Sequence, residues 1–197
     1  MKKILAFTTF LIIILSSISK VYSIEPDVFV QSTVNRASKV LGGDYTIQEK
    51  MEKLKNIAKD TVDINGIGSY SLGTHRKNLT PEQQEIYKDL FEKYFLKTFA
   101  SRLAEYTNPE VRVDLSDKLN KNYTMVHSVL IATEQRPEIK IGWRVYTKNP
   151  DNLLIRDLII EGLSLARTQK EEFNSIILSN DGNIDFLFVS LNQFINK

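Results

Sequence analysis

The chain has 197 residues, with 26 Lys or Arg, 24 Asp or Glu and no Cys. The first 23 residues contain three Lys and no acid, so the remaining 23 basic and 24 acidic residues carry a net charge of −1. This near-neutral charge argues against a nucleic-acid-binding surface, and the lack of Cys excludes disulfides and thiolate metal sites.

Residues 1–23 have the pattern of a secretory signal peptide. Lys2 and Lys3 precede an apolar run, Ile4 to Ile18, which is shorter than the about 20 residues that span a bilayer. We expect cleavage before Ile24, and the alternative is an uncleaved N-terminal anchor. Residues 24–197 have the size of one domain, so we expect a single exported domain.

Hydrophobic periodicity and capping residues predict helices in the first half of the chain. The predicted ranges are 26–41, 46–62 and 80–106. The second and third begin with capping-box sequences, Thr46 to Glu49 and Thr80 to Gln83. The third helix is apolar over a wider arc than a surface helix normally buries, so it needs apolar neighbours on several sides, either protein or ligand.

Three glycines, Gly66, Gly68 and Gly73, lie between the second and third predicted helices. Gly66-Ile67-Gly68 loosely matches a dinucleotide-binding turn, but it does not follow a predicted strand. We therefore predict a flexible or turning segment here.

The second half of the chain alternates between apolar and polar residues, which predicts strands. The predicted ranges are 111–115, 123–133, 139–147 and 153–160. Short polar connections suit hairpins, so the strands should form an antiparallel meander. Two closing helices are predicted over 164–178 and 183–195. The predicted fold class is α+β, with a curved sheet of about four strands packed against several helices.

Sequence motifs of common enzymes are missing from the chain. There is no G-x-S-x-G sequence and no G-x-x-x-x-G-K-[ST] loop, and His75 and His127 lack the spacing of metal ligands. We therefore expect no catalytic residue, no metal and no cofactor. The alternative is a secreted hydrolase or isomerase on a cone-shaped α+β scaffold, in which one of these His residues and a nearby acid transfer a proton.

Three blocks of sequence, in this order, resemble one family. The first is Ser71-Leu72-Gly73 followed by Leu79-Thr80-Pro81-Glu82-Gln83. The second is Leu90-Phe91 with Lys97-Thr98-Phe99-Ala100 and Leu103-Ala104-Glu105-Tyr106. The third is Asp157 to Leu165, followed by Phe173. In their order and spacing the blocks resemble the MlaC family of periplasmic phospholipid carriers, also called toluene-tolerance auxiliary proteins.

The resemblance implies a periplasmic carrier that holds the acyl chains of a phospholipid in an apolar pocket between the sheet and the helices. Such a carrier shuttles phospholipid between an outer-membrane lipoprotein complex and an inner-membrane ABC transporter complex with an MCE-domain subunit, which maintains outer-membrane lipid asymmetry. The implied partners are these two complexes and phospholipid, without nucleic acid, and the expected state is a monomer. Burial of each methylene gains about 0.8 kcal/mol, so an apolar hollow is enough to carry acyl chains.

The predicted lipid-binding residues are apolar side chains of the third helix, the sheet and the first closing helix: Phe91, Phe95, Phe99, Val129, Ile131, Trp143, Val145, Leu158, Ile160, Phe173 and Ile177. Core packing explains each of them equally well, because an amphipathic element has the same pattern in both cases. The candidates for a headgroup phosphate contact are Lys140, Arg144, Arg156 and Lys170, and the alternative is a solvated surface charge.

Overall fold

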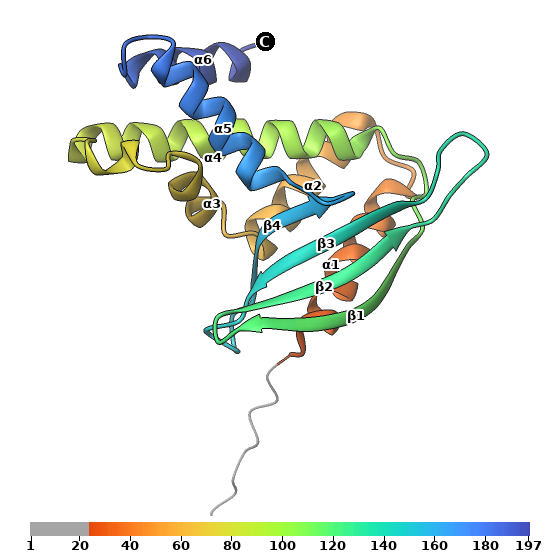
Figure 1. Ribbon diagram of the computed structural model, residues 1–197. Helices are drawn as coiled ribbons and strands as arrows, with labels where there is room; N and C mark the ends of the chain where they lie inside the picture. Colours follow the sequence, from red (N-terminus) through yellow and green to blue (C-terminus); the bar gives the residue numbers. More distant parts are fainter. Residues whose placement is uncertain (1–23) are drawn as a thin grey trace, which may run out of the picture.

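The computed structural model describes residues 24–197 and contains six α-helices, one short 3-10 helix and a five-stranded sheet (Figure 1). The helices are α1 (Pro26–Leu41), α2 (Ile47–Thr61), α3 (Ile64–Ser71), η1 (His75–Lys77), α4 (Pro81–Ala104), α5 (Leu165–Leu178) and α6 (Asp185–Ile195). The strands are β1 (Val111–Asn120), β2 (Tyr123–Leu130), β3 (Ile139–Tyr146), β4 (Leu154–Ile160) and β5 (Leu163–Ser164). The predicted α+β class is confirmed, while the predicted signal peptide, 1–23, lies outside the described residues.

The sheet has the order β1-β2-β3-β4-β5 with every neighbouring pair antiparallel, as the predicted meander requires. Three details differ from the prediction. β1 continues to Asn120, β2 ends at Leu130, and β5 adds a fifth strand. The C-terminal part of β1 was not predicted because residues 114–120 are all exposed, so they lack the burial pattern of a strand. An edge strand can continue its backbone pairing without such a pattern.

Gly66 and Gly68 lie in the helix α3, so the prediction of a flexible segment is wrong for them, whereas Gly73 lies in a turn with positive φ, as predicted. Asp63 caps α3 by accepting a hydrogen bond from the backbone N–H of Gly66 (2.9 Å). Gly68 lies against the ring of Phe91, and a Cβ at this position would come within 2.7 Å of that ring. Close packing, rather than flexibility, therefore explains Gly68.

The helices share a core that is centred on α4. Tyr87 and Phe91 contact Phe173 of α5 edge-on, with ring centroids 6.5 and 6.1 Å apart, and Leu187 of α6 is fully buried in the same cluster. The predicted capping boxes at the starts of α2 and α4 are both formed. α4 thus contacts helices on several sides, as its wide apolar arc indicated.

The side chain of Asp157 in β4 forms hydrogen bonds with residues at the start of α5. Its carboxylate is buried and accepts hydrogen bonds from the Ser164 hydroxyl (2.6 Å) and the Ala166 backbone N–H (3.0 Å), and Arg144 of β3 lies 3.2 Å away. Glu161 and Gly162 lie between β4 and β5, and both have positive φ, which allows the tight turn that connects these strands. The Asp157–Ser164 block therefore stabilises the junction between the sheet and α5.

Replacing Asp157 by Ala should destabilise the protein by about 3 kcal/mol or more, because Arg144 and the start of α5 lose a buried partner. Urea unfolding followed by circular dichroism measures the change. The matched control is Asp114→Ala, which removes an exposed ion pair with Arg112 and should cost at most about 1 kcal/mol. Equal stabilities of the two variants would contradict this role of Asp157.

Tyr87 should make the stability of the protein sensitive to alkaline pH. Burial raises the pKa of its hydroxyl, which donates to the carbonyl of Gly68 (2.9 Å), far above the ordinary value of 10.0. The neutral hydroxyl is kept on folding, so its contribution is fully present below pH 10.0 and is lost as the pH rises above it.

Above pH 10.0, the wild type should therefore lose about 1.4 kcal/mol more per pH unit than Tyr87→Phe. Below that pH the variant should be less stable by about 1 kcal/mol, since it lacks the hydrogen bond. Urea unfolding at a series of pH values tests both expectations. Parallel pH profiles of the two proteins would show that Tyr87 does not titrate as argued.

Candidate functional site

The face of the sheet that contacts α1, here called the inner face, carries a row of apolar side chains. At one end, Val126 and Val145 are fully buried against Val30 and Val34 of α1. Farther along, the register places five residues on the same face that stay only partly buried: Ile139, Ile141, Trp143, Leu158 and Ile160. We call these five the inner row. α1 therefore covers only part of the inner face.

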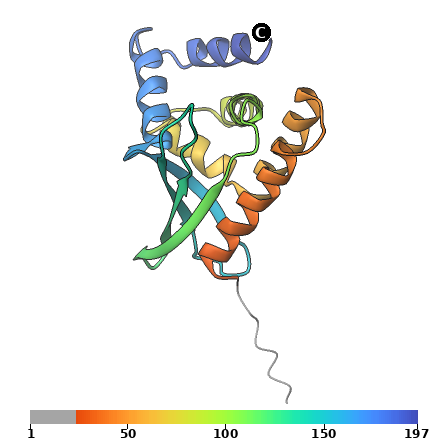
Figure 2. The same cartoon turned by 90° about the vertical axis from the view of Figure 1, so that its right-hand side faces the viewer.

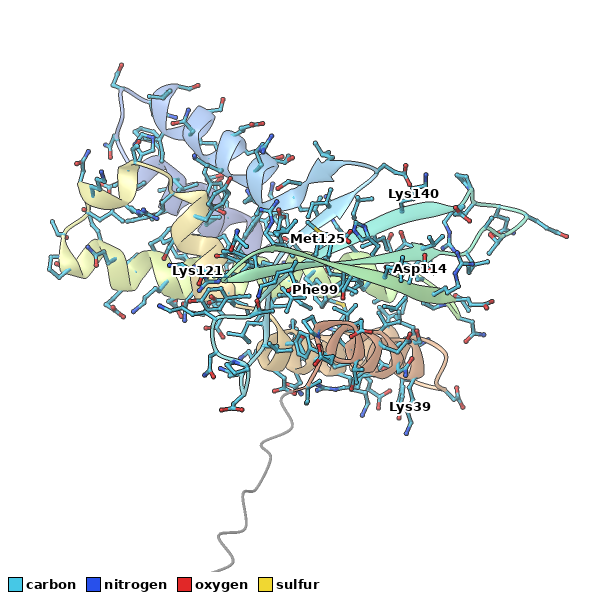
Figure 3. All side chains as sticks on the ribbon, turned by 60° about the horizontal axis from the view of Figure 1, so that its bottom comes forward. Lys39, Phe99, Asp114, Lys121, Met125 and Lys140 are labelled. Carbon is cyan, nitrogen blue, oxygen red and sulfur yellow. The ribbon has the colours of Figure 1, made fainter. Side chains whose placement is uncertain are left out.

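One side of α4 carries apolar residues that are only partly buried. Ala100 and Ala104 pack toward Leu54 of α2, and Tyr94 contacts α6 through Phe194. Three residues at intervals of four are partly buried. Phe95 and Phe99 pack against the helical core, and Leu103 packs against the same cluster as Ala100 and Ala104. We call Phe95, Phe99 and Leu103 the α4 stripe. Its first two rings stack, with centroids 5.9 Å apart, and in Figure 3 Phe99 is seen between the strands and α1.

Trp143 has a fixed orientation in the inner row. Its indole N–H donates to the hydroxyl of Ser128 (2.8 Å), which lies on the same face of the neighbouring strand. Since this hydrogen bond satisfies the indole nitrogen, the part of the ring that remains accessible is apolar. The inner row and the α4 stripe thus offer apolar surface without an unpaired indole donor.

Five of the eleven predicted lipid-binding residues belong to the inner row or to the α4 stripe: Phe95, Phe99, Trp143, Leu158 and Ile160. Phe91, Phe173 and Ile177 lie in the helical core, and Val145 is buried against α1.

The other two predicted residues lie away from the inner row. Val129 is on the opposite, outer face, where it pairs with Lys140. Ile131 follows the end of β2, and its backbone N–H donates to Glu110.

The inner row and the α4 stripe also contain three residues that were not among those predicted: Leu103, Ile139 and Ile141. The signal was present, since Ile139 and Ile141 alternate in phase with Trp143, and Leu103 follows Phe99 by four residues. Val129 was misplaced because its strand is apolar on both faces near its end, so alternation does not distinguish them.

The cations considered for headgroup contact already have protein partners or lie on the outer face. Arg144 pairs with Asp157, and Arg156 donates to Asp63 (2.6 Å) while its guanidinium lies 3.7 Å from the Tyr146 ring centroid. Lys170 lies over the ring of Tyr70. Lys140 is exposed on the outer face, where Figure 3 shows it on the side of the sheet away from α1.

The described surface carries two open hollows. One, of about 560 Å³, runs between α1 and β1 and is lined by residues such as Gln31, Arg36 and Asp114. The other, of about 350 Å³, lies on the outer face beside Met125 and His127. Their linings include none of the residues of the inner row except Ile141, and none of the α4 stripe.

Neither His residue contacts the inner row. His127 lies on the outer face, where its Nε2 is 3.0 Å from the carboxylate of Asp117, and both side chains are exposed. His75 contacts the amide of Asn174. Within residues 24–197 no three His, Asp or Glu side chains gather closely enough to hold a metal ion, and none of the helices there could cross a membrane.

Comparison with solved structures relates this arrangement to a phospholipid-binding protein. The protein from Ralstonia solanacearum, solved in complex with a phospholipid, is 22% identical and superposes with a TM-score of 0.74. The likeness covers 88% of this chain and 98% of that chain, and it establishes a shared fold. A comparison with curated proteins returned no match.

The family model described as MlaC protein matches residues 31–193. This range is most of the chain, and it includes α2 to α5 and the whole sheet. The chain therefore belongs to the MlaC family.

Proposed function

We propose that this protein is a phospholipid carrier that holds acyl chains between the inner row and the α4 stripe. Membership of the MlaC family and the fold of a protein solved with a bound phospholipid both support this function. The observation that carries the proposal is the incomplete burial of apolar side chains that point inward, between the sheet and the helices.

Free energy favours an apolar occupant for this space. Trp143, Leu158 and Phe99 keep accessible apolar surface, and covering such surface gains roughly 25 cal/mol per Å². A pair of long acyl chains exposed to water would cost on the order of 20 kcal/mol at about 0.8 kcal/mol per methylene. Binding of the acyl chains to these side chains removes the apolar surfaces of both the lipid and the protein from water. This binding requires no nucleophile or metal.

The route of transport follows from the family resemblance. We infer that residues 1–23 direct export, that residues 24–197 act as one monomeric domain in the periplasm, and that the carrier moves phospholipid between an outer-membrane lipoprotein complex and an inner-membrane ABC transporter complex with an MCE-domain subunit. The transporter ATPase would supply the energy. On this account the protein is not an enzyme.

Replacing Phe99 by Asp should lower phospholipid binding by roughly tenfold or more, because a carboxylate is costly to place among acyl chains. The measurement is uptake of a fluorescent phospholipid from vesicles, quantified after gel filtration. Phe99 is partly buried, so circular dichroism must show that the variant is folded.

The matched control is Phe186→Asp, which introduces the same change at a half-exposed position on α6 and should leave uptake unchanged. Equal uptake by the folded Phe99 variant and the wild type would refute the proposed position of the acyl chains. A wild type that takes up no phospholipid would refute the carrier function itself.

A further inference from the structure

The loop between β2 and β3 holds one arginine in a fixed position. Two backbone hydrogen bonds close a short turn in this loop. The N–H of Thr133 donates to the carbonyl of Arg136 (2.8 Å), and the N–H of Arg136 donates to the carbonyl of Thr133 (3.2 Å). The guanidinium Nη2 of Arg136 donates to the carbonyl of Ile131 (3.1 Å), and the guanidinium lies over the ring of Tyr106, 5.3 Å from its centroid. The side chain is therefore oriented before any ligand binds.

Arg136 lacks a carboxylate partner, unlike the other partly buried arginines of residues 24–197. Arg144 pairs with Asp157, and Arg156 pairs with Asp63, but no ion pair of the described residues includes Arg136. Its Nε is buried and makes no hydrogen bond. A partly buried charge without a counter-ion is unfavourable, and a bound anion would relieve this cost.

The position of Arg136 connects it to the proposed acyl-chain space. Tyr106, the ring beneath the guanidinium, follows Leu103 by three residues, and both side chains pack against the same cluster at the end of α4. Figure 1 shows the β2–β3 loop extending past this end of α4. At about 1.5 Å per residue, the stripe from Phe95 to Leu103 is roughly 12 Å long, and the cation lies at its far end.

We propose that Arg136 binds the phosphate of the phospholipid headgroup while the acyl chains lie along the α4 stripe. A guanidinium matches phosphate geometry and presents several donors, and Nη1 of Arg136 has no partner among the described residues. An apolar stripe that ends in a cation distinguishes a phospholipid from a neutral lipid with the same chains. This assignment rests on the proposed carrier function and names the group that selects its ligand.

The test compares two fluorescent lipids with the same acyl chains, phosphatidylglycerol and diacylglycerol, both delivered from cyclodextrin. The wild type should bind phosphatidylglycerol roughly tenfold more tightly. Arg136→Gln should abolish this difference by weakening phosphatidylglycerol alone, and unchanged diacylglycerol binding shows that the variant is folded. Arg112→Gln, which removes the same charge from an exposed position on β1, should behave like the wild type.

If Arg136→Gln does not fold, an NMR measurement on the wild type tests the same headgroup contact. The side-chain Nε resonance of Arg136 in a nitrogen-15 NMR spectrum should shift on addition of phosphatidylglycerol and should not shift on addition of diacylglycerol. Identical spectra with both lipids would overturn the assignment.

The other outcomes separate this inference from the proposed function. If the wild type binds phosphatidylglycerol and Arg136→Gln keeps the full preference, Arg136 is not the headgroup contact, while the carrier function stands. If the wild type binds neither lipid, the carrier function fails. Inorganic phosphate should bind weakly and give way to phosphatidylglycerol; tight phosphate binding at Arg136 that the lipid does not displace would indicate a site for free phosphate and would overturn the headgroup assignment.

Discussion

The arrangement of this protein depends on the unequal covering of the inner face of its sheet. α1 packs tightly against Val126 and Val145, yet the inner row beyond them stays partly accessible. α4 is held in place by contacts with α2, α3, α5 and α6, and the α4 stripe stays only partly buried. In Figure 2, α4 is seen end-on above the sheet and α1.

Two polar clusters hold the sheet against the helices around this space. Asp157 fixes the start of α5 to β3 and β4, while Asp63 caps α3 and accepts a hydrogen bond from Arg156 of β4. Both clusters use side chains from the helices and the sheet, so they constrain the distance between the two layers.

Much of the fold could be predicted from the sequence because its signals are local. Capping boxes at Thr46 and Thr80 marked the starts of helices, and alternation of apolar and polar residues indicated strands such as β3. α3 was missed because the role of Gly68 lies in its contact with Phe91, which is far away in the sequence. The long β1 was missed because backbone pairing at an edge leaves little trace in the side chains.

The candidate site was only partly predictable for a related reason. Apolar periodicity identified Phe99 and Trp143 but also selected Phe91 and Ile177, which are buried in the helical core. Periodicity shows which way a side chain points from its element, whereas the amount of cover depends on neighbouring elements. Arg136 gave no sequence signal, because its missing counter-ion becomes apparent only when Arg144 and Arg156 are seen to be paired.

Trp143, the single tryptophan of the chain, allows the most direct test of the central claim. Phospholipids with brominated acyl chains quench a tryptophan only when the bromine atoms come close to its ring. The account predicts strong quenching of Trp143 emission in the purified complex, relative to the same lipid without bromine. Stoichiometric binding of the brominated lipid with unchanged Trp143 emission would contradict it, because the chains would then lie away from the inner row.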